Sequence, residues 1–194
     1  MKRIIALLLA VLSVFAFVAC TGDDGAGDIT PFKNALNSAP VSATITSKIE
    51  SGDITLEGEY NVTYADGVAT VAYTNEVLGI IPEDGDVPAE KTEVPGAATV
   101  AADGAVSAGA IGNNYAVLIA RKIALDSSKM ISYSISGDVL VATFTSANST
   151  ALTAGYANTD VALNVSISGG KVMGISVSYG TAAGTVSIVC TYNY

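Results

Sequence analysis

The sequence contains no histidine and no tryptophan, and it has only two cysteines, Cys20 and Cys190. Without an imidazole, a Ser-His-Asp triad, a Cys-His pair and a histidine-ligated zinc site are all excluded. Charged residues make up only 14% of the chain, and its net charge is -9. Such a surface repels nucleic-acid phosphates and anionic headgroups, so we expect no nucleic-acid partner. No nucleotide-binding fingerprint occurs either. We therefore expect a non-enzymatic protein with no catalytic residue and no cofactor.

The N-terminal residues have the pattern of a secretory signal peptide. Residues 1–19 read MKRIIALLLAVLSVFAFVA, in which two basic residues precede an apolar run that is too short to be a permanent membrane span. Residues 20–28 (CTGDDGAGD) are rich in glycine and aspartate, a composition typical of a flexible tether. The remaining residues, 29–194, have the size of a single domain.

The signal peptide ends at Ala19, and residues 17–20 read Phe17-Val18-Ala19-Cys20. This FVAC sequence resembles the lipobox of bacterial lipoproteins, although Phe17 stands where leucine is usual. The resemblance implies cleavage between Ala19 and Cys20 and attachment of a diacylglyceryl group to Cys20. It also implies an extracytoplasmic protein, anchored by acyl chains such as palmitate to the cell membrane or outer membrane of a bacterium. The alternative is an ordinary secretory signal with a chance cysteine.

From Val41 onward, apolar and polar residues alternate with the period of two that is typical of half-buried β-strands. Asp66-Gly67, Gly137-Asp138 and Gly169-Gly170 lie between such stretches and predict hairpin turns. The apolar sides predicted around the last two turns comprise Ile131, Tyr133 and Ile135, then Val161, Leu163, Val165 and Ile167, and then Met173, Ile175, Val177 and Tyr179. We expect about nine to eleven antiparallel strands in mainly sequential order.

One helix is predicted at the start of the domain. Thr30 is a typical N-cap residue, Pro31 suits the first helical position, and Pro40 would end the helix. Its apolar face would comprise Phe32, Ala35, Leu36 and Ala39. Residues 79–112 show little pattern apart from a short hairpin around Asp103-Gly104, and the β-branched content of residues 115–125 favours a strand over a helix.

Three groups of residues have chemistry that needs an explanation. Cys190 alternates with apolar residues while Cys20 is the lipid-attachment residue, so we expect a buried core thiol rather than a disulfide or a nucleophile. Glu57 and Glu59 share the polar side of one strand, and we expect them to face solvent rather than to form a glycosidase pair. The acidic run between Glu83 and Glu93 lacks the DxDxDG calcium-loop pattern, so we expect a solvated loop and no metal site.

Tyrosine is the abundant aromatic residue, with nine copies against four of phenylalanine. Its ring is apolar and its hydroxyl is polar. Five tyrosines fall on the apolar side of their predicted strands: Tyr60, Tyr64, Tyr133, Tyr179 and Tyr192. Two interpretations stay open. On a partly open concave wall the hydroxyls would contact water and the residues would line a ligand cavity, whereas in a closed core each hydroxyl needs a hydrogen-bond partner.

One short helix cannot cover the apolar side of so many strands, so the sheet must curl, pack against a second sheet or leave a concavity. We expect a mainly β fold, an antiparallel meander that forms a curved sheet or half-barrel, with a β-sandwich as the alternative. The succession of lipid anchor, helix and meander resembles the Lol-type half-barrel carriers of lipids and lipoproteins. This resemblance implies a membrane-anchored envelope protein that binds an apolar ligand such as an acyl chain. The alternative is a structural or protein-interaction β-domain displayed on the cell surface.

Overall fold

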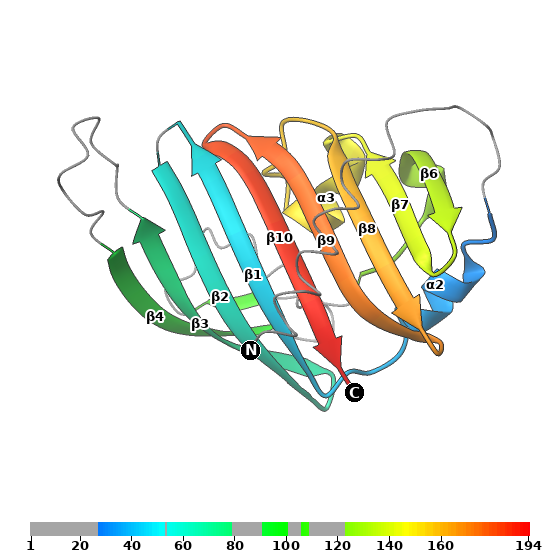
Figure 1. Ribbon diagram of the computed structural model, residues 1–194, viewed down its shortest axis with the longest axis horizontal. Helices are drawn as coiled ribbons and strands as arrows, with labels where there is room; N and C mark the ends of the chain where they lie inside the picture. Colours follow the sequence, from blue (N-terminus) through cyan, green and yellow to red (C-terminus); the bar gives the residue numbers. More distant parts are fainter. Residues whose placement is uncertain (1–26, 53, 79–90, 101–105, 109–122) are drawn as a thin grey trace.

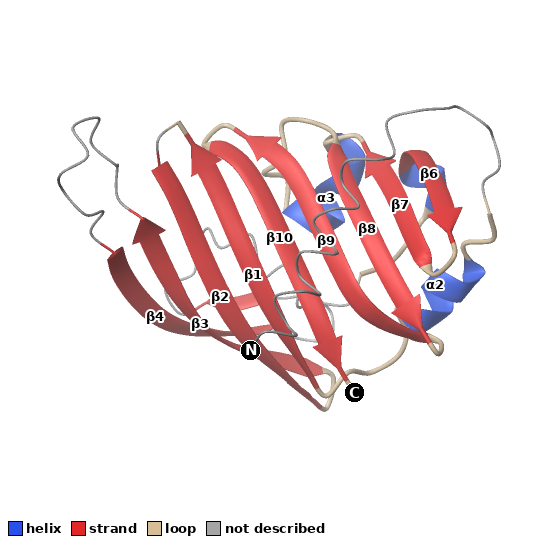
Figure 2. Cartoon of the chain, viewed as in Figure 1, coloured by secondary structure: helices blue, strands red, loops and turns tan. Residues whose placement is uncertain are grey.

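The computed structural model describes residues 27–52, 54–78, 91–100, 106–108 and 123–194. Strands dominate this part of the chain (Figure 2). They are β1 (Ser42–Ser51), β2 (Ile54–Ala65), β3 (Val68–Leu78), β4 (Lys91–Val100), β5 (Val106–Ala108), β6 (Met130–Ser136), β7 (Val139–Phe144), β8 (Val161–Ser168), β9 (Lys171–Thr181) and β10 (Gly184–Asn193). The helical elements are α2 (Thr30–Ala35), α3 (Thr150–Thr153) and the 3-10 turns η3 (Ser127–Lys129) and η4 (Ala147–Ser149).

The strands form one 10-stranded sheet in the order β5-β4-β3-β2-β1-β10-β9-β8-β7-β6. Every neighbouring pair is antiparallel. The sheet curves to one side, and its edge strands β5 and β6 do not pair with each other, so it stays unclosed (Figure 1). The predicted curved antiparallel sheet is therefore confirmed, and the sandwich alternative is wrong because the described strands make a single sheet.

The order of the strands is sequential except at the centre of the sheet. There β1 pairs with β10, the last strand, so that Ile45 lies opposite Cys190. From this pair one meander runs through β2 to β5 and the other runs through β9 to β6 (Figure 1). The first and last strands of the domain are thus held in the middle of the sheet, where each has a neighbour on both sides.

All three predicted hairpin turns are present. Asp66 (φ 53) and Gly67 (φ 77) join β2 to β3, and Gly169 (φ 56) and Gly170 (φ 75) join β8 to β9. Positive φ at both positions gives a two-residue turn the twist that antiparallel strands need. At the turn between β6 and β7 only Gly137 takes a positive φ, of 57.

The predicted N-terminal helix is present as α2, but it is shorter than expected and its cap is different. Ile29 occupies the N-cap position, and the carboxylate of Asp28 accepts a hydrogen bond of 2.9 Å from the Thr30 amide. The helix ends at Ala35 because the carbonyl of Ala35 accepts both the amide and the hydroxyl of Ser38. That carbonyl would otherwise accept the amide of Ala39 in a continuing α-helix. The helical turn α3 was not predicted.

The core lies on the concave side of the sheet. The largest fully buried side chains there are Phe32, Ile45, Leu140, Leu163, Ile175, Ile188, Val62, Val71 and Val161. Phe32 and Ala35 of α2 pack over this side, where α2 contacts β8 and β9. Further apolar surface comes from Leu152 of α3 and from Ile123 and Leu125, which precede η3. Helix α2 and α3 therefore cover the half of the sheet that contains β7 to β9 (Figure 1).

Two predicted core residues are on the wrong side of the sheet. Met173 and Ile131 are 43% and 53% exposed. Each lies at a β-bulge: Ser166 pairs with Gly174 but Ile167 with Val172, and Met130 pairs with Phe144 but Ser132 with Thr143. A bulge adds one residue to one strand and so shifts the side-chain alternation by one position. Val172 consequently occupies the buried position that the sequence assigned to Met173.

Several expectations lie wholly or partly outside the described residues. These include the signal peptide, most of the tether, and the acidic segment up to residue 90. The hairpin predicted around Asp103-Gly104 is flanked by β4 and β5, which pair antiparallel with Thr99 opposite Ser107, while the turn itself is not described. Of the strand predicted for residues 115–125, only 123–125 are described, and they form no strand.

Candidate functional site

Four of the five candidate tyrosines lie on the concave side of the central strands. Tyr60 and Tyr64 belong to β2, Tyr192 to β10 and Tyr179 to β9. Tyr60, Tyr179 and Tyr192 are only 2%, 3% and 9% exposed, and Tyr64 is half-buried. The fifth, Tyr133, is half-buried on β6 at the edge of the sheet, so the structure does not bring it together with the others.

The position of Tyr60 depends on a glycine two residues earlier in β2. A Cβ atom on Gly58 would lie 2.5 Å from the Tyr60 hydroxyl oxygen and 2.9 Å from its ring. The ring therefore lies over the space that Gly58 leaves open. Its hydroxyl lies 3.3 Å from the hydroxyl of Ser47, which is opposite Gly58 on β1. This contact gives the buried phenol a polar neighbour within the core.

Tyr64, Tyr192 and Cys190 form a second cluster where β2, β1 and β10 meet. The rings of Tyr64 and Tyr192 are tilted by 36° with their centroids 6.5 Å apart. Cys190 is fully buried and is a free thiol, so the predicted core thiol is confirmed. Burial raises its pKa to about 12, which keeps the thiol protonated and unreactive. Burial likewise raises the pKa of Tyr64 and of Tyr192.

Tyr133 contacts the point where the described chain begins. Its hydroxyl donates a long hydrogen bond of 3.5 Å to the carbonyl of Gly27. A Cβ atom on Gly27 would lie 3.3 Å from Cβ of Ile135 on the same strand. Gly27 therefore lies on the concave side of β6 just before α2 begins.

The burial of the tyrosines shows whether the concave side of the sheet is packed or open to water in the described part of the chain. Tyr60, Tyr179 and Tyr192 pack within the apolar core cluster together with Ile45, Val62 and Ile188. Of the two interpretations from the sequence, the geometry of these three residues is that of a packed core rather than of a wall in contact with water.

The convex side of the sheet is polar. On β1 and on β8 to β10 it presents hydroxyl and amide side chains, which include Thr44, Thr46, Thr191, Ser176, Ser178, Asn164 and Ser166. The Asn164 amide donates to the Ser176 hydroxyl over 3.0 Å, and the Ser166 hydroxyl donates to the Gly174 carbonyl over 3.3 Å. The convex side of these strands thus carries many hydroxyl groups and few charges.

On β1 and β2, the charged residues of the convex side gather toward one end of the two strands. Lys48 and Glu50 form an ion pair whose side chains are 45% and 52% exposed. Glu57 lies opposite Lys48 and Glu59 opposite Thr46, and both glutamates are exposed as predicted. Within the described ranges no group of histidine, cysteine, aspartate or glutamate residues is arranged to hold a metal ion.

The predicted anchor residues Ala19 and Cys20 lie outside the described part of the chain. No helix among the described residues has the length and hydropathy of a membrane span. Sequence reasoning missed Gly58 and Ser47, whose contacts with Tyr60 depend on the pairing of β1 with β2. The available signal was a glycine within a strand, which often marks the close approach of another group.

Comparisons with known proteins identify no family. No protein-family model and no curated protein matches the chain. Among solved structures, a redesigned β-barrel, mFAP1, bound to DFHBI is 10% identical, with 83% of this chain and 99% of that chain covered and a TM-score of 0.25. An N-terminal dehydratase from the difficidin assembly line is 9% identical, with 84% and 80% covered and a TM-score of 0.17.

Proposed function

We propose that the protein is an envelope lipoprotein, anchored through Cys20, that carries a non-enzymatic β-domain on a short tether. The signal peptide and the FVAC sequence support the anchor. Two or three acyl chains hold a protein stably at a bilayer, because each buried methylene contributes about 0.8 kcal/mol. The domain would then remain near the membrane surface.

The anchor is tested by lipid labelling in a bacterial host. Labelled palmitate should be incorporated into the wild-type protein, which should be processed before Cys20. The Cys20→Ser variant should incorporate none and should keep its signal peptide. A Cys190→Ser variant is the matched control, because a buried core thiol has no part in lipidation and labelling should persist. A wild-type protein that is never labelled would contradict the anchor.

For the domain itself, we propose a structural or protein-interaction role exerted by its surface. The observation that supports this role is the burial of Tyr60, Tyr179 and Tyr192, which makes the concave side a packed core. The convex side, on which Thr191 is exposed and most other hydroxyl-bearing side chains are half-buried, would then provide the surface for contact with other molecules.

Binding of an apolar ligand such as an acyl chain is the second candidate. The unclosed, curved sheet with an apolar concave side favours it. A ligand that binds only the folded state raises the melting temperature by mass action. The test is thermal melting of residues 27–194 with and without palmitate, alongside a Tyr133→Asp variant. A ligand-dependent rise that the variant loses would support the carrier, and unchanged melting would support the surface role.

A further inference from the structure

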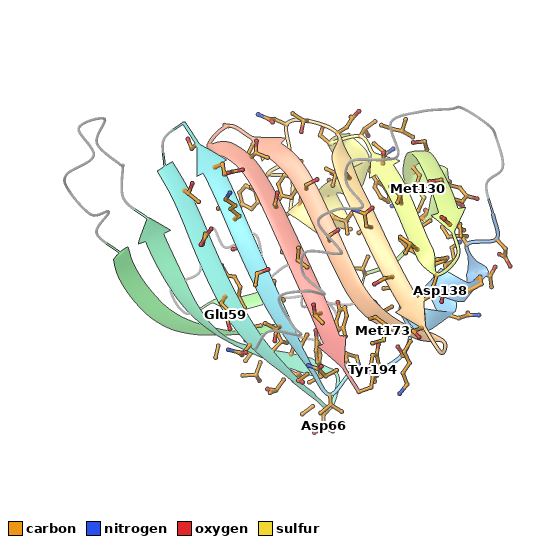
Figure 3. All side chains as sticks on the ribbon, viewed as in Figure 1. Glu59, Asp66, Met130, Asp138, Met173 and Tyr194 are labelled. Carbon is orange, nitrogen blue, oxygen red and sulfur yellow. The ribbon has the colours of Figure 1, made fainter. Side chains whose placement is uncertain are left out.

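Exposed apolar side chains gather at one end of the sheet. Among the described residues, the large apolar side chains that are exposed are Val41, Val68, Ile131, Tyr156, Met173 and Tyr194. Val41, Val68, Met173 and Tyr194 lie where β1, β3 and β9 begin and β10 ends, and we call these four residues the apolar rim. Figure 3 shows Met173 and Tyr194 close together at this end, with Asp66 beyond them.

Backbone pairing and side-chain contacts join the residues of the rim. The amide of Val41 donates to the carbonyl of Asn193, and its carbonyl accepts from the amide of Tyr64, so Val41 lies between β10 and β2. The Nζ atom of Lys171 lies 4.6 Å from the centre of the Tyr194 ring. The Tyr194 hydroxyl lies 2.8 Å from that of Ser38. These contacts hold Tyr194 at the rim beside Met173, which is 43% exposed.

The chain enters the domain close to this same end. Gly27 packs against Ile135, which precedes the Gly137-Asp138 turn by two residues. That turn is level with the end of β8, because Val139 pairs with Ser166. The seven peptide units between Cys20 and Gly27 span at most about 25 Å when fully extended. The anchor at Cys20 is therefore joined to the domain beside the rim end of the sheet, which favours that end as the one that faces the bilayer.

The charges at the rim indicate which kind of bilayer it suits. Lys171 lies beside Tyr194, while Asp66 and Asp138 occupy the turns at the same end (Figure 3). Carboxylates among the apolar residues, together with the net charge of -9, disfavour a strongly anionic surface. Apolar side chains, a tyrosine and a lysine with an apolar stem suit the zwitterionic interface of a phospholipid layer.

We propose that the apolar rim rests in the interface of the phospholipid bilayer to which Cys20 is anchored, so that the strands stand on the membrane with the opposite end directed away from it. This inference depends on the proposed lipid anchor. Ile131 provides an internal comparison, since it is 53% exposed but lies with Met130 at the opposite end, where β6 begins and β7 ends (Figure 3). Both Met173 and Ile131 are exposed residues at bulges. A fluorophore at either position should therefore have a similar, small effect on the fold.

The experiment uses the lipidated protein reconstituted in phosphatidylcholine vesicles. An environment-sensitive fluorophore is attached to cysteine in Met173→Cys, in Val41→Cys and in the control Ile131→Cys. Cys190 is fully buried and should not react with the fluorophore. Wild-type protein treated with the same fluorophore should therefore stay unlabelled. Nitroxide-labelled phosphatidylcholine then quenches fluorophores that contact the lipid, and vesicle flotation reports whether the protein is anchored.

We expect strong quenching at positions 173 and 41 and little at position 131. A protein that floats with the vesicles but shows equal quenching at the two ends, or more at position 131, would overturn the orientation and leave the anchor standing. A protein that does not float would overturn the anchor and the orientation with it.

Discussion

Gly58 and Tyr60 show how one residue position fixes a buried aromatic ring. Because a Cβ atom at Gly58 would lie 2.5 Å from the Tyr60 hydroxyl and 2.9 Å from its ring, the ring and the glycine share one volume in the core. Tyr60 is 2% exposed, so its ring has little space into which it can move. The packing of β2 against β1 therefore depends on the absence of a side chain at position 58.

The Gly58→Ala substitution should destabilise the domain by about 1–3 kcal/mol, the usual cost of overpacking a core. Urea unfolding measures the free energy. In the Tyr60→Leu background, which removes the clashing hydroxyl and ring atoms, the same substitution should cost clearly less, since residues in contact are energetically coupled. Equal costs in the two backgrounds would show that the ring does not depend on Gly58.

At the scale of elements, α2 stabilises the domain through its packing on the sheet rather than through its own length. It has only 6 residues, fewer than an isolated helix needs to be stable in water. Phe32 is 2% exposed and belongs to the core cluster, and α2 contacts β8 and β9. The exposed Asn34 lies on the other side of the same helix.

We expect Phe32→Ala to lower the free energy of unfolding by about 3–5 kcal/mol, the range for removing a buried aromatic side chain. Asn34→Ala is the matched control and should change it by less than about 0.5 kcal/mol. Thermal and urea unfolding of both variants provide the measurement. If the two variants were equally stable, α2 could not be a packed part of the core.

At the scale of the whole molecule, the concave core contains several groups that must stay protonated. Burial raises the pKa of Cys190 from 9.0 to about 12, and it also raises the pKa values of Tyr64 and Tyr192. In the unfolded chain these groups lose their protons at their ordinary pKa values. Between those values and the raised ones the folded state binds more protons than the unfolded state, so stability falls as the pH rises.

The free energy of unfolding should therefore be constant up to about pH 8 and should decrease steadily toward about pH 11. Urea unfolding at a series of pH values measures this dependence. Cys190→Ala should be less stable than wild type at neutral pH, because it loses buried volume, but its stability should decrease less with rising pH. Parallel curves for the two proteins would mean that Cys190 does not contribute to the alkaline loss.

The sequence determined by itself those features that depend on neighbouring residues. Alternation with a period of two predicted the strands, and Asp66-Gly67 and Gly169-Gly170 predicted the hairpins, because positive φ values and strand periodicity are local properties. The burial of Cys190 and the exposure of Glu57 and Glu59 followed from the same alternation. The start of α2 was also predicted to within one residue.

Only the tertiary structure decided the features that depend on distant parts of the chain. The pairing of β1 with β10 places the first and last strands at the centre of the sheet, and no local pattern specifies that neighbour. Likewise, the exposure of Ile131 and Met173 follows from bulges, which are set by the register of β6 on β7 and of β8 on β9. One extra residue reverses the side on which a side chain lies, whereas the alternation of residue types hardly changes. The apolar rim therefore became visible only in the folded chain.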